Sequence, residues 1–539
     1  MKRMTMLLLV LVMIVTSISG YAAEENTLPI CTDGSVKIQF YMGMETGSEQ
    51  AMQTYDEHPA IIELEKRTGV DITFMHPPTN DDGTFFTTTV ASGVWPDAWI
   101  TTNFQTYYPG GISGAIQDAT LYDINELIEK YGWYYQQESA KWEPAVVKNM
   151  KDDDGYWRFG AANQRIPVLG MQHAGAVIRT DWLKKYNLEV PKTVDAFINV
   201  LRTFKENGAA IPLAMSKFTS NSYYDCAFLS GAFGVMPYGY QFKEDGKTVT
   251  ASYLEEGYRD YLAFLHGLYE EGLIDRDFVN RVNNDAQKLI YSGDAGVIFA
   301  GNWTTREILK LGKVAFPEFD IQGISSLRKE DPEAQFHFCY PIINGSSTQA
   351  WAISAKSKFP VETFKVLDYL YSHEGIELMV FGCNEAPAYD NHEKMEVIHT
   401  TLPDGTRQFS DYINNNPKLA YNQIRYIYTI QALSSEYSSD MEYQQYNAPI
   451  NAQCWEAWTY KVDNLQRLPN ARSYTAEESQ ELVPKNNDVQ TYIYDIIYKI
   501  ICGDEPIENW PTHVQRLHDL GIDQSIAIEQ ASCDRYFAR

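Results

Sequence analysis

A tryptophan and an asparagine follow a short apolar run near the middle of the chain. Residues 291–305 read YSGDAGVIFAGNWTT, and the segment from Gly296 to Ala300 suits a buried strand. Asn302 and Trp303 come directly after it. An indole ring has an apolar face and an N–H group, and an amide has a donor and an acceptor, so this pair is suited to bind a sugar ring. The alternative is that Trp303 packs onto the core at the end of the strand.

Motifs that would indicate catalysis or cofactor binding do not occur: the sequence has no HExxH, CxxC, GxSxG or GxGxxG. Residues 246–248 (GKT) resemble the end of a phosphate-binding loop, but Gln241 stands where its first glycine is required, so we interpret them as a hairpin turn. Residues 152–155 (DDDG) lack the alternating ligands and the distant Glu of a calcium loop. We therefore expect no metal and no cofactor.

Composition favours a neutral ligand with apolar faces. The 71 Asp and Glu residues outnumber 44 Lys and Arg residues, and the net charge of -27 disfavours DNA, RNA and acidic glycans as partners. Aromatic residues make up 13%, with 37 Tyr and 11 Trp, and neutral sugars stack on such rings. A glycoside hydrolase stays open as an alternative, because two catalytic carboxylates need be close only in space.

The amino terminus has the pattern of an export signal. Two basic residues precede an apolar run at residues 6–15, and the small residues Gly20 and Ala22 fit cleavage after residue 22. The run is too short to span a bilayer. The first cysteine, Cys31, does not follow small residues at the end of the run. We expect a signal peptide over residues 1–22 and a periplasmic or extracellular protein without a lipid anchor.

The seven cysteines are odd in number and far apart in sequence, so long-range disulfides and buried thiols are equal alternatives. The chain is long enough for two to four domains, or for two large lobes.

Alternating strands and helices predict an α/β fold. Residues 36–42 and 70–74 have the β-branched and aromatic character of strands, and residues 60–67 between them have helical spacing. This βαβ unit predicts a largely parallel sheet covered by helices. Further helices are predicted at 180–186, 194–205, 255–269, 284–291 and 360–371, with Thr180 and Thr193 as caps. The stripe of Tyr and Leu in 255–269 has the period of a core face.

Five short segments, in sequence order, resemble those of extracellular solute-binding proteins of ATP-binding-cassette sugar importers. They are residues 91–97 (ASGVWPD), 177–183 with 191–193 (VIRTDWL and PKT), 268–275 (LYEEGLID), 291–296 (YSGDAG), and the closing helices around 501–503 and 520–536. The chain is most similar to the LplA-like oligosaccharide-binding branch of family 1. The resemblance covers nearly all of the chain after the signal peptide.

The resemblance implies a type II periplasmic-binding-protein (Venus-flytrap) fold, in which two α/β lobes close on a ligand without catalysis. We expect crossings between the lobes near residues 160–172, near 342–353 and after Phe381. The expected divisions are 23–165 for lobe 1, 166–345 for lobe 2, 346–385 for the return to lobe 1, and a mainly helical segment at 386–539 that completes both lobes. The expected partners are an oligosaccharide and a membrane permease, with the protein itself a monomer.

The resemblance also implies where the ligand lies. The strand before Asn302 and Trp303 ends at the cleft in this family, so the pair would supply a stacking face and a hydroxyl partner. Trp351 matches the place where the chain returns, although residues 351–353 also read as a buried strand. Weaker candidates complete the predicted ligand site: Trp95, Asp97, Tyr107, Tyr238, Glu385, Tyr389 and Trp455.

In two respects the sequence departs from the family. Residues 205–212 (KENGAAIP) are short and lack the acids of the calcium loop found in several relatives, so no calcium is expected there. Many relatives are anchored by a lipid attached to a cysteine, and this sequence has no cysteine at the matching position. A peptide or lipid-like solute carrier on the same fold is a further alternative; it would line the cleft with aliphatic groups in place of indoles and amides.

Overall fold

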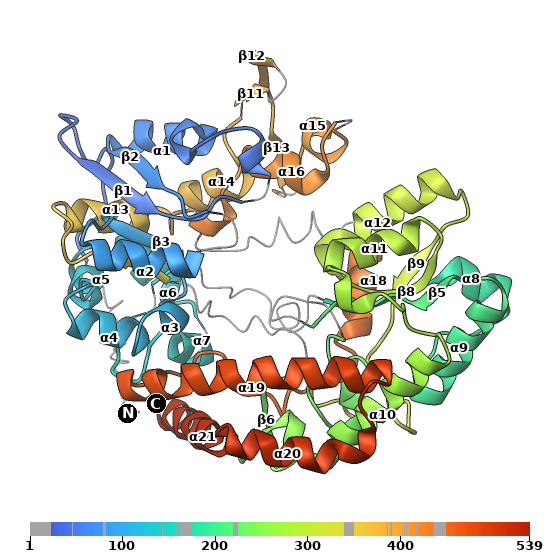
Figure 1. Ribbon diagram of the computed structural model, residues 1–539. Helices are drawn as coiled ribbons and strands as arrows, with labels where there is room; N and C mark the ends of the chain where they lie inside the picture. The colour runs from blue at the N-terminus through green and yellow to red at the C-terminus, as the bar shows by residue number, and fades with distance from the viewer. Residues whose placement is uncertain are drawn as a thin grey trace, which may run out of the picture.

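The computed structural model describes residues 23–45, 47–78, 82–142, 144–157, 159–160, 174–218, 225–338, 350–384, 386–388, 391–403, 405, 407–416, 418–434 and 449–539. Its buried side chains form two sets of hydrophobic clusters. Residues 23–160 and 350–434 contribute to one set, and residues 174–338 and 449–539 contribute to the other. We call these parts the first lobe and the second lobe; they lie at the left and right of Figure 1.

The first lobe is built on a four-stranded sheet with the order β10-β3-β1-β2. Its strands are β1 (Lys37–Tyr41), β2 (Asp71–Met75), β3 (Ala98–Thr102) and β10 (Ala350–Ile353). Strand β1 pairs in parallel with β2 and β3, whereas β10 runs antiparallel to β3. The predicted βαβ unit is therefore confirmed, with α1 (Pro59–Thr68) as its helix. The helix begins where the His58 ring accepts from Ala60 N, and it ends at Gly69, whose φ of 70° suits glycine.

Short helices cover this sheet. Before the first crossing they are α2 (Asp82–Ser92), α3 (Phe104–Tyr107), α4 (Gly111–Gln117), α5 (Asn125–Tyr131), α6 (Trp133–Ser139) and α7 (Pro144–Asn149). After β10 the chain adds α13 (Pro360–Tyr369), α14 (His373–Phe381), β11 (Ala386–Ala388), β12 (Asn391–Glu396), β13 (His399–Thr401), β14 (Arg407–Phe409), α15 (Asp411–Asn414) and α16 (Tyr421–Tyr426). Short 3-10 turns lie at Ser48–Gln50, Tyr55–Glu57 and Gln431–Leu433. Residues 391–434 thus belong to the first lobe and include three strands.

The second lobe has a four-stranded sheet with the order β5-β8-β4-β9. Its strands are β4 (Ala174–Arg179), β5 (Ile211–Leu213), β8 (Ala295–Gly301) and β9 (Ile321–Gly323), and a separate hairpin joins β6 (Tyr240–Phe242) to β7 (Val249–Ala251). Its helices are α8 (Thr180–Lys185), α9 (Val194–Glu206), α10 (Glu256–Glu270), α11 (Asn283–Tyr291), α12 (Asn302–Ala315) and α18 (Pro449–Trp458). The 3-10 turns are Ser230–Phe233, Ser252–Leu254 and Phe278–Asn280. The hairpin confirms the interpretation of residues 246–248.

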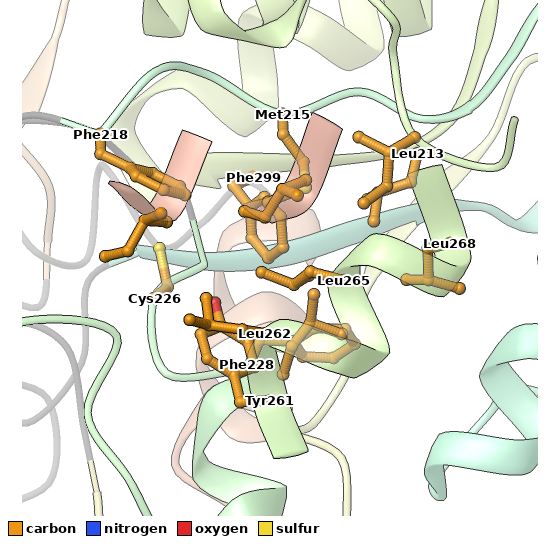
Figure 2. Close-up of a cluster of buried hydrophobic side chains, with 14 of the residues drawn as sticks. Leu213, Met215, Phe218, Cys226, Phe228, Tyr261, Leu262, Leu265, Leu268 and Phe299 are labelled. Atoms are coloured by element: carbon orange, nitrogen blue, oxygen red, sulfur yellow. The ribbon is translucent and has the colours of Figure 1, made fainter. Parts of the chain in front are cut away.

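The core of the second lobe contains the predicted stripe. Tyr261, Leu262, Leu265 and Leu268 of α10 point toward side chains of β5, of β8 and of the segment around Phe228 (Figure 2). All four are buried, because residues three and four apart lie on one helix face. Thr193 caps α9 as predicted, but Thr180 is the first residue of α8 and Arg179 takes the cap position.

Three C-terminal helices run beneath both lobes in Figure 1: α19 (Ala476–Cys502), α20 (Trp510–Asp519) and α21 (Ile522–Ala538), with a 3-10 turn at Ile507–Asn509. Helix α19 packs on α10, so this layer is continuous with the core of the second lobe. Its other end reaches the first lobe. We call that contact the base junction: Arg535 and Tyr536 of α21 and the following residue Arg539, with Asn149 and Asp153 of the first lobe and Glu478 of α19.

The first two predicted crossings, near 160–172 and near 342–353, fall mainly on residues outside the described ranges. The predicted divisions at 165/166 and 345/346 lie there too. After Phe381 the described chain stays in the first lobe through residue 434 and belongs to the second lobe from residue 449. Six of the seven cysteines are described, all as free thiols, and four of these are buried. Within the described ranges, no helix combines the length and apolar character needed to cross a bilayer.

Candidate functional site

The two sheets present comparable edges to the crossing segments. In the first lobe, the carboxyl ends of β1, β2 and β3 share one edge, and Ala350, the first residue of β10, pairs with Thr102 at that same edge. In the second lobe, Ala174 at the start of β4 pairs with Gly301 at the end of β8. The chain leaves the first lobe at Gly160 and is next described at Ala174, on this edge of the second lobe. Ligands bind outside the carboxyl ends of strands in open α/β sheets.

Helix α12 begins directly at this edge of the second lobe. Asn302 and Trp303 are its first two residues, so the predicted strand is confirmed and is followed by a helix without a loop. The side chains of both residues lie outside the described part, and their role stays a prediction. The first turn is held in place by Thr305, whose hydroxyl donates to Asn451 Oδ1 of α18 at 2.7 Å.

Arg306, three residues beyond Trp303, contacts the first lobe. The central carbon of its guanidinium lies 5.2 Å from the centre of the Tyr421 ring in α16. A cation over a tyrosine ring at this distance is a cation–π contact. We call these two residues the interlobe pair. In Figure 1, α12 and α16 lie on the side of the molecule away from α19–α21, so the lobes meet at two separated places.

Behind Tyr421 lies a charged cluster of the first lobe. The Arg425 guanidinium carbon lies 5.6 Å from the Tyr421 ring centre and 4.4 Å from that of Tyr426. Glu45, four residues after the end of β1, interacts with Arg425, and one of its carboxyl oxygens is buried without a hydrogen-bond partner. Burial raises the pKa of Glu45 to about 8 although Arg425 acts in the opposite direction. This carboxyl is therefore mostly protonated at neutral pH.

A ring cluster fixes the loop that carries Glu45. Tyr55 Oη accepts a hydrogen bond from Glu45 N at 2.7 Å, and His76 Nε2 accepts one from Tyr55 N at 3.1 Å. The rings of Tyr55 and His58 meet edge to face, with centres 5.5 Å apart. The same loop holds α16, because the Ser48 hydroxyl donates to Tyr426 O at 2.6 Å. These contacts hold α16, and with it Tyr421, the first-lobe member of the interlobe pair.

Tyr107, a weaker sequence candidate, also follows the carboxyl end of a strand. It ends α3, and its ring packs near Phe86, with 5.7 Å between the ring centres. Together with residues 106–109, the start of α19 at residues 479–484 lines a cavity of about 290 Å³. Tyr107 therefore lies where the first lobe meets the C-terminal helices.

Trp95 and Asp97, two further sequence candidates, directly precede β3, whose first residue Ala98 pairs with Phe40 near the end of β1. Asp97 accepts from Gln39 N at 2.9 Å and from the Ser357 hydroxyl at 2.6 Å, which ties β1 to the residues after β10. The Trp95 ring lies under Lys356 Nζ, 3.8 Å from the ring centre. The contacts that the structure gives both side chains therefore lie within the first lobe.

Three other candidates are packed inside the lobes. Trp351 in β10 is 1% exposed and donates from Nε1 to Ala432 O at 3.1 Å, as the alternative of a buried strand predicted. Trp455 in α18 is 3% exposed, on the helix that contacts β9. Tyr238 is half-buried against the second-lobe core. The rings of Trp351 and Trp455 offer no free face to a ligand in this arrangement.

Glu385 and Tyr389 lie outside the described residues, so their predicted roles are not placed. Among the residues that are described, no group of three His, Cys, Asp or Glu side chains is arranged to hold a metal ion. Residues 207–210, where relatives carry a calcium loop, form the short connection between α9 and β5.

Sequence reasoning missed Glu45, Arg306, Tyr421 and Arg425. One available signal was the position of Arg306, one helical turn after the predicted Trp303. The other three had no such signal: Tyr421 and Arg425 fall in the Tyr- and Asn-rich stretch 414–460, where no element boundaries were assigned, and Glu45 follows β1 among ordinary loop residues.

Solved structures share this fold over nearly the whole chain. The HMO-binding ABC-transporter-associated solute-binding protein from Bifidobacterium longum infantis matches with a TM-score of 0.75 and 17% identity, over 94% of this chain and 99% of that one. The substrate-binding protein FusA from Streptococcus pneumoniae, in complex with kestose, matches with a TM-score of 0.73 and 20% identity, over 93% and 99%. These likenesses confirm the predicted fold.

Sequence relatives extend over most of the chain. The polygalacturonan/rhamnogalacturonan-binding protein YtcQ of Bacillus subtilis is 25% identical over 87% of this chain and 86% of its own length. The fructooligosaccharide ABC transporter substrate-binding protein FusA is 22% identical over 96% and 93%. Lipoprotein LipO of Bacillus subtilis is 26% identical, but that match spans 45% of this chain and 46% of LipO.

A family model covers more than half of the chain. The model is that of the bacterial extracellular solute-binding proteins, and it matches residues 47–377. This stretch contains the four-stranded sheet of the second lobe, all strands of the first-lobe sheet except β1, the Arg306 half of the interlobe pair and four of the five segments on which the resemblance was based. The chain belongs to the family of bacterial extracellular solute-binding proteins.

Proposed function

We propose that this protein is the solute-binding component of an ATP-binding-cassette importer of the LplA-like branch, and that it captures an oligosaccharide between its lobes without breaking a bond. The observation that carries the proposal is the likeness, over nearly the full length, to YtcQ and FusA. Both are named for saccharide polymers or oligomers. Family membership itself supports binding in place of catalysis.

The arrangement of the lobes supports a closing mechanism. Each sheet has an edge at which strands end, at Thr102 in the first lobe and at Gly301 in the second, and the lobes touch at the interlobe pair. A ligand bound between these edges contacts both lobes at once, and it stabilises the closed arrangement by its differential affinity for that state. The permease of the importer then recognises the closed form, and the protein acts as a monomer in this step.

Aromatic stacking supplies the affinity in this proposal. Trp303, at the start of α12, stacks on a sugar ring, and Asn302 binds its hydroxyl groups. We further propose that the chain is exported and loses residues 1–22. Since the relative LipO is a lipoprotein, surface anchoring by another route is compatible with this function. Mass spectrometry of the secreted protein tests the export step, with Ala23 as the expected first residue.

The test is a thermal-melting and tryptophan-fluorescence titration of the secreted protein against an oligosaccharide panel, with product analysis of each mixture. A ligand at 100 times its dissociation constant stabilises the folded state by about 2.7 kcal/mol. We expect such a shift for intact sugars without hydrolysis, and its loss in Trp303→Ala. The matched control is Trp95→Ala, which removes an indole that contacts Lys356 within the first lobe and leaves affinity unchanged.

Three results would contradict the proposal. Appearance of shorter sugars would favour a glycoside hydrolase. A response to peptides alone would favour a peptide carrier on the same fold. Equal loss of affinity in Trp303→Ala and Trp95→Ala would show that α12 does not contribute specifically to the ligand site.

A further inference from the structure

Arg306 is a cation that lacks a carboxylate partner. Many arginines in the described ranges form ion pairs with carboxylates; Arg67, Arg179, Arg202, Arg407, Arg472 and Arg535 do so at 2.5–3.0 Å. Within the described ranges, Arg306 forms no ion pair and no hydrogen bond, and its contact is the Tyr421 ring. A guanidinium that places its face on a ring keeps its N–H groups available at its edge.

Tyr421 contributes an unused donor at the same place. Its hydroxyl is buried and has no hydrogen-bond partner in the described structure. A buried hydroxyl without a partner costs free energy unless a ligand or water pairs with it. The ring is fixed from behind by Phe409, at 6.2 Å between ring centres, and by Arg425 at 5.6 Å.

Two positive charges from opposite lobes therefore converge on one ring. Arg306 comes from the second lobe and Arg425 from the first. Glu45 interacts with Arg425, but it lies on the first-lobe side of the cluster and its burial favours the neutral form. An anionic group placed between the lobes would bind the free edge of Arg306.

We infer that the interlobe pair is a subsite for a carboxylate-bearing sugar, a uronic acid residue of the bound oligosaccharide. The Arg306 guanidinium binds the carboxylate through two N–H groups, and the Tyr421 hydroxyl donates a third hydrogen bond. This inference rests on the proposed function and specifies its substrate class. It replaces the expectation of a neutral sugar, which came from the net charge. Charges farther than about 8 Å away are screened at physiological salt. The Arg306–Tyr421 pair, and not the net charge of the whole protein, therefore determines whether an anionic group binds here.

The experiment compares each acidic sugar with its own neutral form by isothermal titration calorimetry. The probes are three uronate oligosaccharides of different ring and linkage, each also as its methyl ester, with a neutral fructooligosaccharide as a further ligand. We expect at least one acid to bind 10-fold or more tighter than its ester. Arg306→Gln should weaken binding of that acid about 30-fold and binding of its ester less than 3-fold.

Further variants separate the charge from the shape of the site. Arg306→Lys keeps the positive charge but cannot bind a carboxylate in the bidentate geometry of arginine. Its affinity for the acid should therefore lie between those of wild type and Arg306→Gln. Tyr421→Phe should weaken the acid about 5-fold. The matched control is Arg516→Gln, which removes an exposed arginine of α20 far from the pair and should leave both affinities unchanged.

The inference is overturned if every acid binds no tighter than its ester, or if Arg306→Gln weakens acid and ester equally. It is also overturned if Arg306→Gln strengthens both, because the interlobe pair would then be a self-contact that competes with ligand. Binding of the fructooligosaccharide alone would overturn the uronate subsite and leave the proposed function intact. Binding of no sugar at all would overturn the proposed function.

Discussion

The two places where the lobes meet differ strongly in the number and kind of contacts. At the base junction, Arg535 forms hydrogen-bonded ion pairs with Asp153 at 3.0 Å and with Glu478 at 2.8 Å, and Tyr536 donates to Asn149 at 2.7 Å. On the other side, the interlobe pair is one cation–π contact. Such a contact contributes about 0.5–1 kcal/mol at an exposed site.

This difference indicates which side of the molecule opens. The base junction links the first lobe to helices that share the core of the second lobe, so its separation would break several charged hydrogen bonds together. The interlobe pair separates at little cost. Motion about the base should therefore open the side that carries α12 and α16, and a bound sugar supplies the small free energy needed to keep it closed.

The largest expected effect comes from breaking the charge network behind the base junction. Glu529 of α21 is 2% exposed and pairs with Arg472 at 2.7 Å, while the Tyr474 hydroxyl donates to it at 2.9 Å. Glu529→Gln leaves the Arg472 charge uncompensated, so the free energy of unfolding should fall by about 3 kcal/mol. Urea denaturation measures this loss. The control is Glu508→Gln, at an exposed position. An equal loss of unfolding free energy in both variants would show that the buried network around Glu529 does not contribute to stability.

The next effect concerns pH and the support of α16. His58 is fully buried; its Nδ1 accepts from Ala60 N, and its Nε2 faces Tyr426 O at 3.4 Å. Burial lowers the pKa of His58 to about 3 from 6.5. The unfolded chain therefore binds a proton that the folded chain does not, and this stability is present above pH 6.5 and is lost as the pH falls toward 3.

Between pH 7 and pH 5 this group should lower the free energy of unfolding by about 2 kcal/mol. His58→Asn keeps a capping side chain and removes the titration, so its stability should fall by about 2 kcal/mol less over the same range. Urea denaturation at both pH values measures the difference. Parallel pH dependence in the two proteins would show that His58 is not a neutral buried cap.

A smaller effect is expected at the base junction itself. The Arg535 side chain is 33% exposed, so solvent screens its ion pairs, and Arg535→Met should reduce the free energy of unfolding by about 1 kcal/mol. The same variant should broaden the distribution of distances between the lobes, because the joint that limits their motion is weakened. Small-angle X-ray scattering measures this broadening. An unchanged scattering profile would place the hinge elsewhere.

The smallest effect on stability is expected at the interlobe pair. Arg306→Ala should change the free energy of unfolding by less than about 0.5 kcal/mol, because the lost contact is weak and on the opening side. Thermal melting without ligand measures this. A loss above 2 kcal/mol would contradict the comparison between the two junctions, since the pair would then hold the lobes together.

The sequence was sufficient for the local elements and for the fold. The spacing of Ile61 and Leu64 predicted α1, and the apolar stripe around Leu262 predicted a core helix. Both predictions succeeded because the hydrophobic periodicity of a helix depends only on residues that are close in sequence. The site was less predictable. Trp351 has the same residue type as Trp303, and only long-range contacts, such as the hydrogen bond to Ala432 O, identify it as core. The Arg306–Tyr421 contact joins residues 115 positions apart, which no local pattern records.

The distance between the lobes tests the central claim most directly. Spin labels at the exposed positions Ile62 of α1 and Val314 of α12, introduced by Ile62→Cys and Val314→Cys with the half-exposed Cys383 and Cys502 replaced by serine, report on the opening side. Without ligand, pulsed electron–electron double resonance should give a broad distribution of distances between the two labels. A saturating oligosaccharide should narrow it to one short distance without hydrolysis of the sugar. Identical distributions with and without bound sugar would contradict closure of the lobes around a ligand.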